Sequence, residues 1–501
     1  MTQVAPRPAV TAAAGRRKES WREWLDAELS SGWCVAGWAA ASVVFVACIT
    51  LTGGFGRIDS QLWVYTTWAV AHGDFNCAYP SVTMPHQPLI APVYPLFAGA
   101  VTAVAGIGHA VPFPSHAAMG AHCNGADVAI KHWAARAGAA GPTRAISFSG
   151  WLVLLVGMVA WLRSAGRGRR RWEPATLLFV AALPLVWSCD GLYMHPQDLF
   201  ALGLGLAAMA CARRQWWGAA GALIALGVLT HQYALLIAAP LLVLAPSGRR
   251  GRYVGAAAAT AVCLVAPLYV VSDGTILRAI TIGSGATASF GGTVMWEVSH
   301  RGALSVLISR VLPIVLALAV SWWVVRRLGP RLSASPTVML SLVAVSLSLR
   351  LVYEQNLYEY YFMALAVTLV LLDVTRGRIR ASVLVWLATT LMTFSLDNYF
   401  LRVASGLHLQ NVLPPLVLIV TLSAAAIGIV RGRTWRRWTV LLWSCLVVCA
   451  LVTWTGLWLP TWFVQVIFVG TGALLAATPL FELWPEAARH EEVSLPSTSS
   501  G

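Results

Sequence analysis

Long apolar segments separated by short arginine clusters run through this sequence, and they limit the folds that are open to the chain. A helix needs about 20 apolar residues to cross the hydrocarbon core of a bilayer. Such segments recur between residues 33 and 480, and only 11% of the residues are charged. An average soluble domain carries about 25% charged residues. The sequence therefore predicts an all-α, polytopic integral membrane protein.

The arginine clusters predict how the spans are oriented, because short basic loops stay in the cytoplasm. The richest cluster, 163–171, would face outward if the apolar run 88–108 crossed the membrane. Pro88, Pro92 and Pro95 interrupt that run, and proline breaks a straight helix. We therefore predict one outer loop over 53–144 that carries two membrane-lying helices, at about 60–72 and 93–107.

This choice predicts about 14 spans and places every later arginine cluster on the cytoplasmic side. The expected spans are about 33–52, 145–162, 174–190, 197–212, 216–230, 231–246, 253–271, 303–325, 336–352, 358–374, 381–396, 411–430, 438–457 and 461–480.

The same map divides the chain into three parts. Residues 1–32 form a cytoplasmic N-terminal segment, 33–480 a transmembrane domain, and 481–501 a cytoplasmic tail. The composition of 1–15 and of about 486–501, rich in Pro, Ser, Thr and Glu toward the C-terminus, predicts disorder at both ends.

The net charge of +15 would suggest nucleic-acid binding in a soluble protein. Here the basic residues fall in short clusters between apolar segments, so they are topology signals and contacts for anionic lipid headgroups. The expected partners therefore include membrane lipids and exclude nucleic acid.

A single carboxylate, Asp59, follows the first expected span and lies next to Arg57. The aromatic run after it, including Trp63, Tyr65 and Trp68, is typical of a helix in the membrane interface. An acid held there is well placed to act on a lipid-linked substrate. The alternative, that Asp59 is a solvated loop residue, remains open at this point.

Further polar clusters fall on the outer ends of the expected spans. Ionisable residues near membrane depth are costly, so they mark a functional site or pair with one another. Five clusters on one face favour a site there. Besides the first loop, they are Asp190–Asp198, Thr230–Tyr233, the loop 272–302 and Arg350–Tyr361.

Part of this pattern resembles a known group of enzymes. The segment His195-Pro-Gln-Asp is followed by Arg213-Arg214-Gln-Trp-Trp-Gly, a glycine-rich span, and then Thr230-His231. Together with the acid after the first span, it resembles the GT-C superfamily of glycosyltransferases, and within it the actinobacterial mannosyltransferase-like branch. The resemblance covers about 33–250. It departs from the branch at His231, where Lys is common, and in the longer spacing from Asp59 to Tyr65.

The resemblance implies a polyprenyl-phosphate sugar donor and a cell-envelope glycolipid or glycan acceptor, with mannose or arabinose as the first choices of sugar. Asp59 would act as the general base of an inverting transfer, since the acceptor hydroxyl must lose its proton as the new bond forms. No second carboxylate nucleophile is needed for inversion. The enzyme would be a multi-pass plasma-membrane protein with both termini in the cytoplasm and its active site outside.

The leaving phosphate gains charge, so cationic groups are expected beside it. The candidates for donor phosphate binding are Arg350, His231, His195 and Arg301. The other candidates for substrate binding are Arg57, Gln197, Asp198, Glu354, Asn356 and Tyr360.

Simpler interpretations of these residues stay open. Arg350 could be an arginine that reaches toward the interface, and the histidines could be hydrogen-bonded residues of a helix bundle. Two other functions also remain: a transporter or flippase of lipid-linked glycans, which favours charges near mid-span, and a non-catalytic membrane scaffold.

Cys77 and Cys123 are the two cysteines within the expected outer loop, an oxidising location. A disulfide between them would close a loop of about 45 residues and contribute roughly 3–4 kcal/mol. Two free thiols are the alternative. No cofactor is predicted. A divalent metal stays an open alternative without a motif behind it, because the first-loop histidines lack a ligand spacing such as HExxH.

Overall fold

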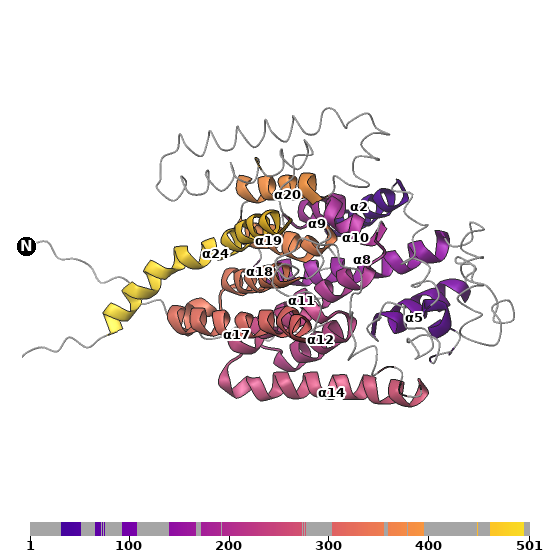
Figure 1. The fold of residues 1–501 in the computed structure, drawn as a ribbon, viewed down its shortest axis with the longest axis horizontal. Coiled ribbons are helices and arrows are strands. Elements are labelled where there is room, and N and C mark those ends of the chain that lie inside the picture. The colour runs from indigo at the N-terminus through magenta and orange to yellow at the C-terminus, as the bar shows by residue number, and fades with distance from the viewer. Residues whose placement is uncertain are drawn as a thin grey trace, which may run out of the picture.

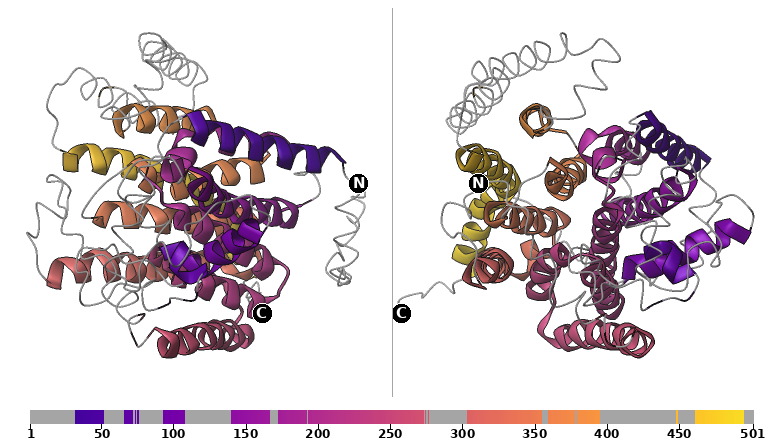
Figure 2. Two further views of the ribbon diagram at one scale, coloured as in Figure 1. Left: turned by 90° about the vertical axis from the view of Figure 1, so that its right-hand side faces the viewer. Right: turned by 45° about the vertical axis from the view of Figure 1, so that its right-hand side comes forward.

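Every regular element in the described part of this computed structural model is a helix, and most helices run roughly side by side (Figures 1 and 2). The structure describes residues 32–51, 66–71, 73, 75, 93–107, 140–166, 172–191, 193–272, 274, 276, 303–354, 359–377, 379–394, 448 and 461–494.

The first half of the chain supplies ten of the sixteen helices whose bounds lie in the described residues. They are α2 (Gly32–Leu51), α5 (Val93–Ile107), α8 (Ala140–Ser164), α9 (Glu173–Ala182), α10 (Pro184–Gly191), α11 (Pro196–Arg213), α12 (Trp217–Thr230), the 3-10 helix η3 (Gln232–Ala234), α13 (Leu235–Leu244) and α14 (Ser247–Val271). The second half supplies α17 (Ala303–Ser333), α18 (Pro336–Tyr353), the 3-10 helix η4 (Glu359–Phe362), α19 (Met363–Thr375), α20 (Ala381–Phe394) and α24 (Thr461–Ser494).

Several of these helices are long and apolar enough to cross a membrane. Within the described residues, five pass that test, and a sixth is added if the bent pair α9–α10 forms one span. The predicted all-α, membrane-type class is therefore confirmed at this level. The predicted spans 411–430 and 438–457 lie outside the described residues, except for residue 448. The five helices that are long and apolar enough to cross a membrane are Arg144–Ser164, Ser247–Val271, Ile308–Gly329, Pro336–Tyr353 and Trp462–Trp484.

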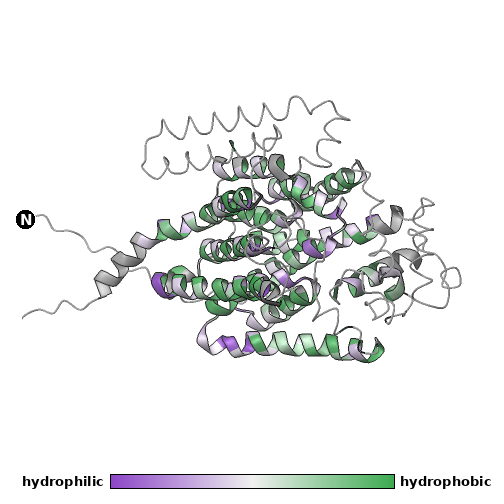
Figure 3. Ribbon diagram, in the orientation of Figure 1, coloured by the Kyte–Doolittle hydropathy of each residue, from purple (hydrophilic) through white to green (hydrophobic). Residues whose placement is uncertain are grey.

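Basic helix ends gather at one end of the bundle. Arg213, closing α11, donates to the backbone oxygens of Ser164 (3.2 Å) and Ala334 (3.3 Å). Arg163, near the end of α8, forms a buried ion pair with Glu173 at the start of α9, with 3.0 Å between Nε and Oε2. The hydrophilic turns of α14 and α17 lie on this same side (Figure 3). The charge pattern predicted that these connections share one face.

The opposite end carries the described pieces of the predicted outer loop. The Tyr94 hydroxyl of α5 donates to the Ile146 backbone oxygen at the start of α8, at 2.7 Å. Trp68 belongs to the same buried cluster, together with Phe200 of α11 and Leu229 of α12. These described pieces therefore pack over the ends of α8, α11 and α12 that lie away from the basic side.

Two helical pieces match the expected membrane-lying helices. The bounds of α5 agree with the predicted 93–107, and residues 66–71 are helical within the predicted 60–72.

The span predicted over 174–190 corresponds to two helices, α9 and α10, rather than one. The α9–α10 pair bends by 52° at Leu183. Leu183 precedes Pro184, and a residue before proline is pushed out of the helical region. Its ψ of 120° is extended. The bend redirects α10 toward the start of α11.

The predicted disorder of the C-terminal tail is wrong in part. Helix α24 continues beyond residue 480 to Ser494. Ala487, Ala488 and the flanking Glu and Arg residues favour a helix. Pro496 then prevents further helical hydrogen bonding, so the helix ends before it.

Helices α8 and α11 approach each other through glycine. A Cβ atom on Gly203 would lie 2.3 Å from the backbone oxygen of Val153, and one on Gly157 would lie 2.1 Å from that of Gly203. Backbone atoms in two helices cannot move aside as a flexible side chain can. This contact sets the spacing of the two helices under the candidate site.

We expect Gly203→Ala to destabilise the protein by about 1–3 kcal/mol through overpacking. The measurement is the melting temperature of the detergent-solubilised protein. Gly255→Ala in α14 is the matched control, since a Cβ there meets nothing within 4 Å. The control should leave the melting temperature unchanged or raise it slightly. Equal melting temperatures for both variants would contradict the close packing of α8 and α11.

Candidate functional site

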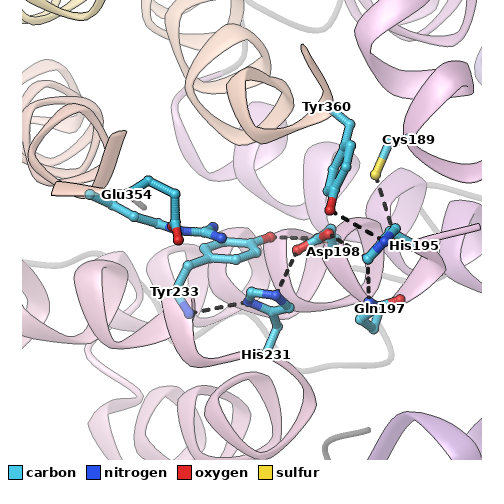
Figure 4. A network of polar contacts seen from close by, with 9 residues as sticks. Cys189, His195, Gln197, Asp198, His231, Tyr233, Glu354 and Tyr360 are labelled. Carbon is cyan, nitrogen blue, oxygen red and sulfur yellow. Dashed lines mark hydrogen bonds and ion pairs between the residues drawn. The ribbon is translucent and has the colours of Figure 1, made fainter. Parts of the chain in front are cut away.

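Polar side chains from four places in the chain converge on the end of the bundle away from the basic side. They come from the connection between α10 and α11, the connection between α12 and α13, the end of α18, and η4 (Figure 4). The residues that Figure 4 labels are Cys189, His195, Gln197, Asp198, His231, Tyr233, Glu354 and Tyr360.

A tight turn between α10 and α11 places His195. The Met194 amide donates to the Asp190 backbone oxygen (3.1 Å), and the His195 amide donates to that of Cys189 (2.9 Å). Met194 has a φ of 54°, a left-handed conformation that is costly for a residue with a side chain. Pro196 then begins α11, a favoured position for proline. The turn thus fixes His195 just ahead of the first turn of α11.

His195 is held on two sides. Its Nδ1 lies 2.8 Å from Gln197 Nε2, and its Nε2 lies 3.3 Å from the Tyr360 hydroxyl. Its ring also stacks on Tyr360, with 4.5 Å between centroids. Burial, and next the charge of Arg350, lower the pKa of His195 from 6.5 to about 4. His195 is therefore neutral near pH 7.

His231 is neutral as well, because its Nδ1 accepts a hydrogen bond from a backbone amide and therefore carries no proton. The Tyr233 backbone amide donates to His231 Nδ1 at 3.3 Å. The proton of the neutral ring is therefore on Nε2, which faces Asp198 Oδ1 at 3.3 Å. The Tyr233 hydroxyl donates to the Asp198 backbone oxygen at 2.5 Å, so both aromatic side chains tie η3 to α11.

Arg350 is the permanent cation of this cluster. Its Nε donates to Glu354 Oε2 at 3.0 Å. Its guanidinium lies over two rings, 5.2 Å from the centroid of Tyr233 and 5.1 Å from that of Tyr361. Among the described residues no acceptor binds its two terminal nitrogens. The ion pair and the rings hold the guanidinium in place and leave its two terminal nitrogens without an acceptor among the described residues.

A cavity of about 350 Å³ opens beside Arg350. Its walls are mostly apolar and come from α12, α13 and α17, for example Leu229, Leu236 and Ile314. Arg350, Glu354 and, from α17, Arg310 supply its charged lining. A space with apolar walls and two arginines suits an amphipathic anion.

The structure brings together seven of the residues that the sequence singled out, the six named below and Tyr360. The other predicted residues, which include the candidate base and both cysteines, lie outside the described residues, so their roles stay predictions. The six are His195, Gln197, Asp198, His231, Arg350 and Glu354, with Tyr360 stacked on the first of them. The others are Asp59, Arg57, Arg301, Asn356, Cys77 and Cys123.

Three residues of the site were not assigned a role from sequence. Tyr233 supports both Arg350 and Asp198, and Arg310 lines the cavity. Asp190 is fully buried, and neither carboxylate oxygen has a partner among the described residues. A charge within an apolar segment was the available signal for Arg310. Tyr233 was noted as part of the Thr230–Tyr233 cluster, but its contacts with Arg350 and Asp198 depend on how the helices pack.

We expect the wild type to lose stability relative to a His195→Gln variant as the pH is lowered from about 6.5 toward 4. In that range the unfolded state takes up a proton at His195 and the folded state does not, which costs at most about 3 kcal/mol. The difference in melting temperature between the two proteins in detergent, measured between pH 7 and 4.5, reports this loss separately from the titration of other buried groups. A difference that stays constant with pH would contradict the neutral, buried His195.

The arrangement can bind an anion through Arg350 and accept hydrogen bonds through Asp198 and Gln197. In the part of the chain that the structure describes, no group of three or more His, Cys, Asp or Glu side chains is arranged to hold a metal. Comparison with protein-family models and with curated protein sequences finds no match to this chain.

Proposed function

We propose that the protein is a membrane glycosyltransferase of the GT-C type, which transfers one sugar from a polyprenyl-phosphate sugar to a cell-envelope glycolipid or glycan. The observation that carries the proposal is Arg350, held by Glu354 and two tyrosine rings beside an apolar cavity. A fixed guanidinium next to an apolar space matches a phosphate with a hydrocarbon chain.

The cavity offers an apolar wall for the isoprenoid chain of such a donor and arginines for its phosphate. Leu235, Leu236 and Ile314 offer an apolar wall for the first isoprene units. Arg350 can bind two phosphate oxygens through its terminal nitrogens, and Arg310 adds a second positive charge. Because His195 and His231 are neutral, the arginines supply the charge that binds the phosphate.

The chemistry requires one base and a stabilised leaving group. Asp59 would accept the proton of the acceptor hydroxyl as the sugar carbon is attacked. The bond from that carbon to the phosphate oxygen breaks, and the departing phosphate gains a negative charge. Arg350 is positioned to stabilise this charge, which grows in the transition state.

The proposal includes the location. With about 14 spans and both termini in the cytoplasm, the site would face outward from the plasma membrane. The support is the packing of α5 and Trp68 at the site end, while Arg163 and Arg213 lie at the other end. Mannose or arabinose remains the first choice of sugar from the sequence resemblance.

A transfer assay tests the function. The purified protein in lipid nanodiscs is given farnesyl phosphoryl mannose or farnesyl phosphoryl arabinofuranose, together with a polar lipid extract of the cells that make it. Release of farnesyl phosphate, with the label of the sugar appearing in a new glycolipid, is the expected result. Intact donor after long incubation with every sugar would contradict the proposal.

A further inference from the structure

Two hydrogen-bond acceptors at the start of α11 lack donors. The Gln197 Oε1 atom is buried and has no partner among the described residues. In the Asp198 carboxylate, Oδ1 faces the His231 Nε2 proton at 3.3 Å, but Oδ2 faces only His195 Nδ1, at 3.7 Å, and has no donor among the described side chains. Buried acceptors in native proteins are paired, so these two need donors from elsewhere.

The rings of His195 and His231, which flank these acceptors, are partly exposed to solvent. The side chains of His195 and His231 are 25% and 23% exposed, whereas that of Asp198 is 6% exposed. Since Gln197 Nε2 contacts His195 Nδ1 at 2.8 Å, that nitrogen acts as an acceptor and gives Asp198 no proton. An entering ligand therefore meets neutral rings around a carboxylate that still accepts hydrogen bonds.

This group lies next to the cation of the cavity. Tyr233 connects the two, since its hydroxyl donates to the Asp198 backbone oxygen and its ring faces the Arg350 guanidinium. An anion on Arg350 thus has the carboxylate of Asp198 as a near neighbour across one tyrosine. A second anionic group would be repelled there, but hydroxyl groups would be bound.

We propose that Gln197, Asp198, His195 and His231 form the subsite for the sugar ring of the donor, and that they discriminate by its hydroxyl groups. This inference rests on the proposed function, and it assigns the histidines to the sugar rather than to the phosphate. Sugar hydroxyls donate protons to Gln197 Oε1 and to the Asp198 carboxylate. The ligand class is a furanose or pyranose whose anomeric carbon carries the phosphate.

The test separates the sugar from the phosphate by binding alone. Dissociation constants are measured in nanodiscs for farnesyl phosphate and for the mannosyl, arabinofuranosyl and glucosyl esters of farnesyl phosphate. For each sugar ester, the ratio of the dissociation constant of farnesyl phosphate to that of the ester gives the contribution of the sugar to binding. Gln197→Met and Asp198→Asn keep the size of each side chain, and Arg350→Met is the comparison variant for the phosphate.

We expect the wild type to bind at least one sugar ester more tightly than farnesyl phosphate. Gln197→Met and Asp198→Asn should each reduce that preference about tenfold and leave farnesyl phosphate binding unchanged. Arg350→Met should weaken every ligand. Melting temperatures check folding, and either of the two subsite variants suffices if the other does not fold.

Three outcomes are informative against the proposal. The sugar subsite is overturned if both variants keep the wild-type preference for a sugar ester over farnesyl phosphate. It is also overturned if the wild type binds farnesyl phosphate but prefers none of the three sugar esters. In both cases the site for the donor lipid remains supported. No binding of farnesyl phosphate to the wild type overturns the proposed function, and the subsite with it.

Discussion

Asp59→Asn is expected to lower the turnover of the purified protein by about 10²–10⁴-fold, the usual contribution of a general base. Asparagine keeps the size of the side chain but cannot take the proton of the acceptor hydroxyl. Farnesyl phosphate binding and the melting temperature should stay at their wild-type values, because the charge that binds the phosphate comes from Arg350. The measurements are transfer rate, dissociation constant and melting temperature on the same preparation.

Asp74→Asn is the matched control, as the other carboxylate close to the described helical residues 66–71. Its Gly-Asp setting is typical of a turn, so near-normal turnover is expected. If Asp59→Asn turns over normally and Asp74→Asn does not, the base is Asp74. Normal turnover in both variants moves the base to another residue, such as Asp198 or Glu354.

Arg350→Met is expected to reduce transfer by about 10²–10³-fold, the typical loss when one preorganised group that stabilises developing charge is removed. It should also weaken farnesyl phosphate binding, since the phosphate loses its guanidinium. Arg350→Lys keeps the charge but not the planar fork, so it should restore binding only in part. The readouts are the transfer rate and the dissociation constant for farnesyl phosphate.

Arg326→Met is the control, because Arg326 is an exposed arginine of α17 that contacts the Trp322 ring and does not line the cavity. It should leave transfer and binding unchanged. Equal, small effects of both substitutions would assign Arg350 to a structural role, as an arginine that pairs with Glu354 at a helix end.

The sequence was a good guide wherever a pattern depended on local composition. The bounds of α5 and α18 follow from the lengths of apolar runs between prolines and polar residues. The grouping of basic helix ends follows from charge alone. The bend at Leu183 was readable in principle from Pro184, but a proline within an apolar run also permits a continuous, kinked helix.

The sequence predicted which residues belong to the site, but it did not predict their charges. His195, His231 and Arg350 were selected because ionisable residues at membrane depth are costly. Their charges depend on burial and on one another, which only packing defines: Arg350 keeps its charge beside Glu354 and helps to keep His195 neutral. The support from Tyr233 is a tertiary contact without a signal in the order of residues.

A structure of the protein with bound farnesyl phosphate, determined by electron cryomicroscopy in nanodiscs, tests the account most directly. We predict phosphate density within hydrogen-bond distance of the Arg350 guanidinium and the isoprenoid chain between α13 and α17. Asp59 should lie on the side of the phosphate where the sugar begins, next to Asp198. A phosphate bound at the basic end of the bundle, or an empty cavity with lipid bound elsewhere, would contradict the account.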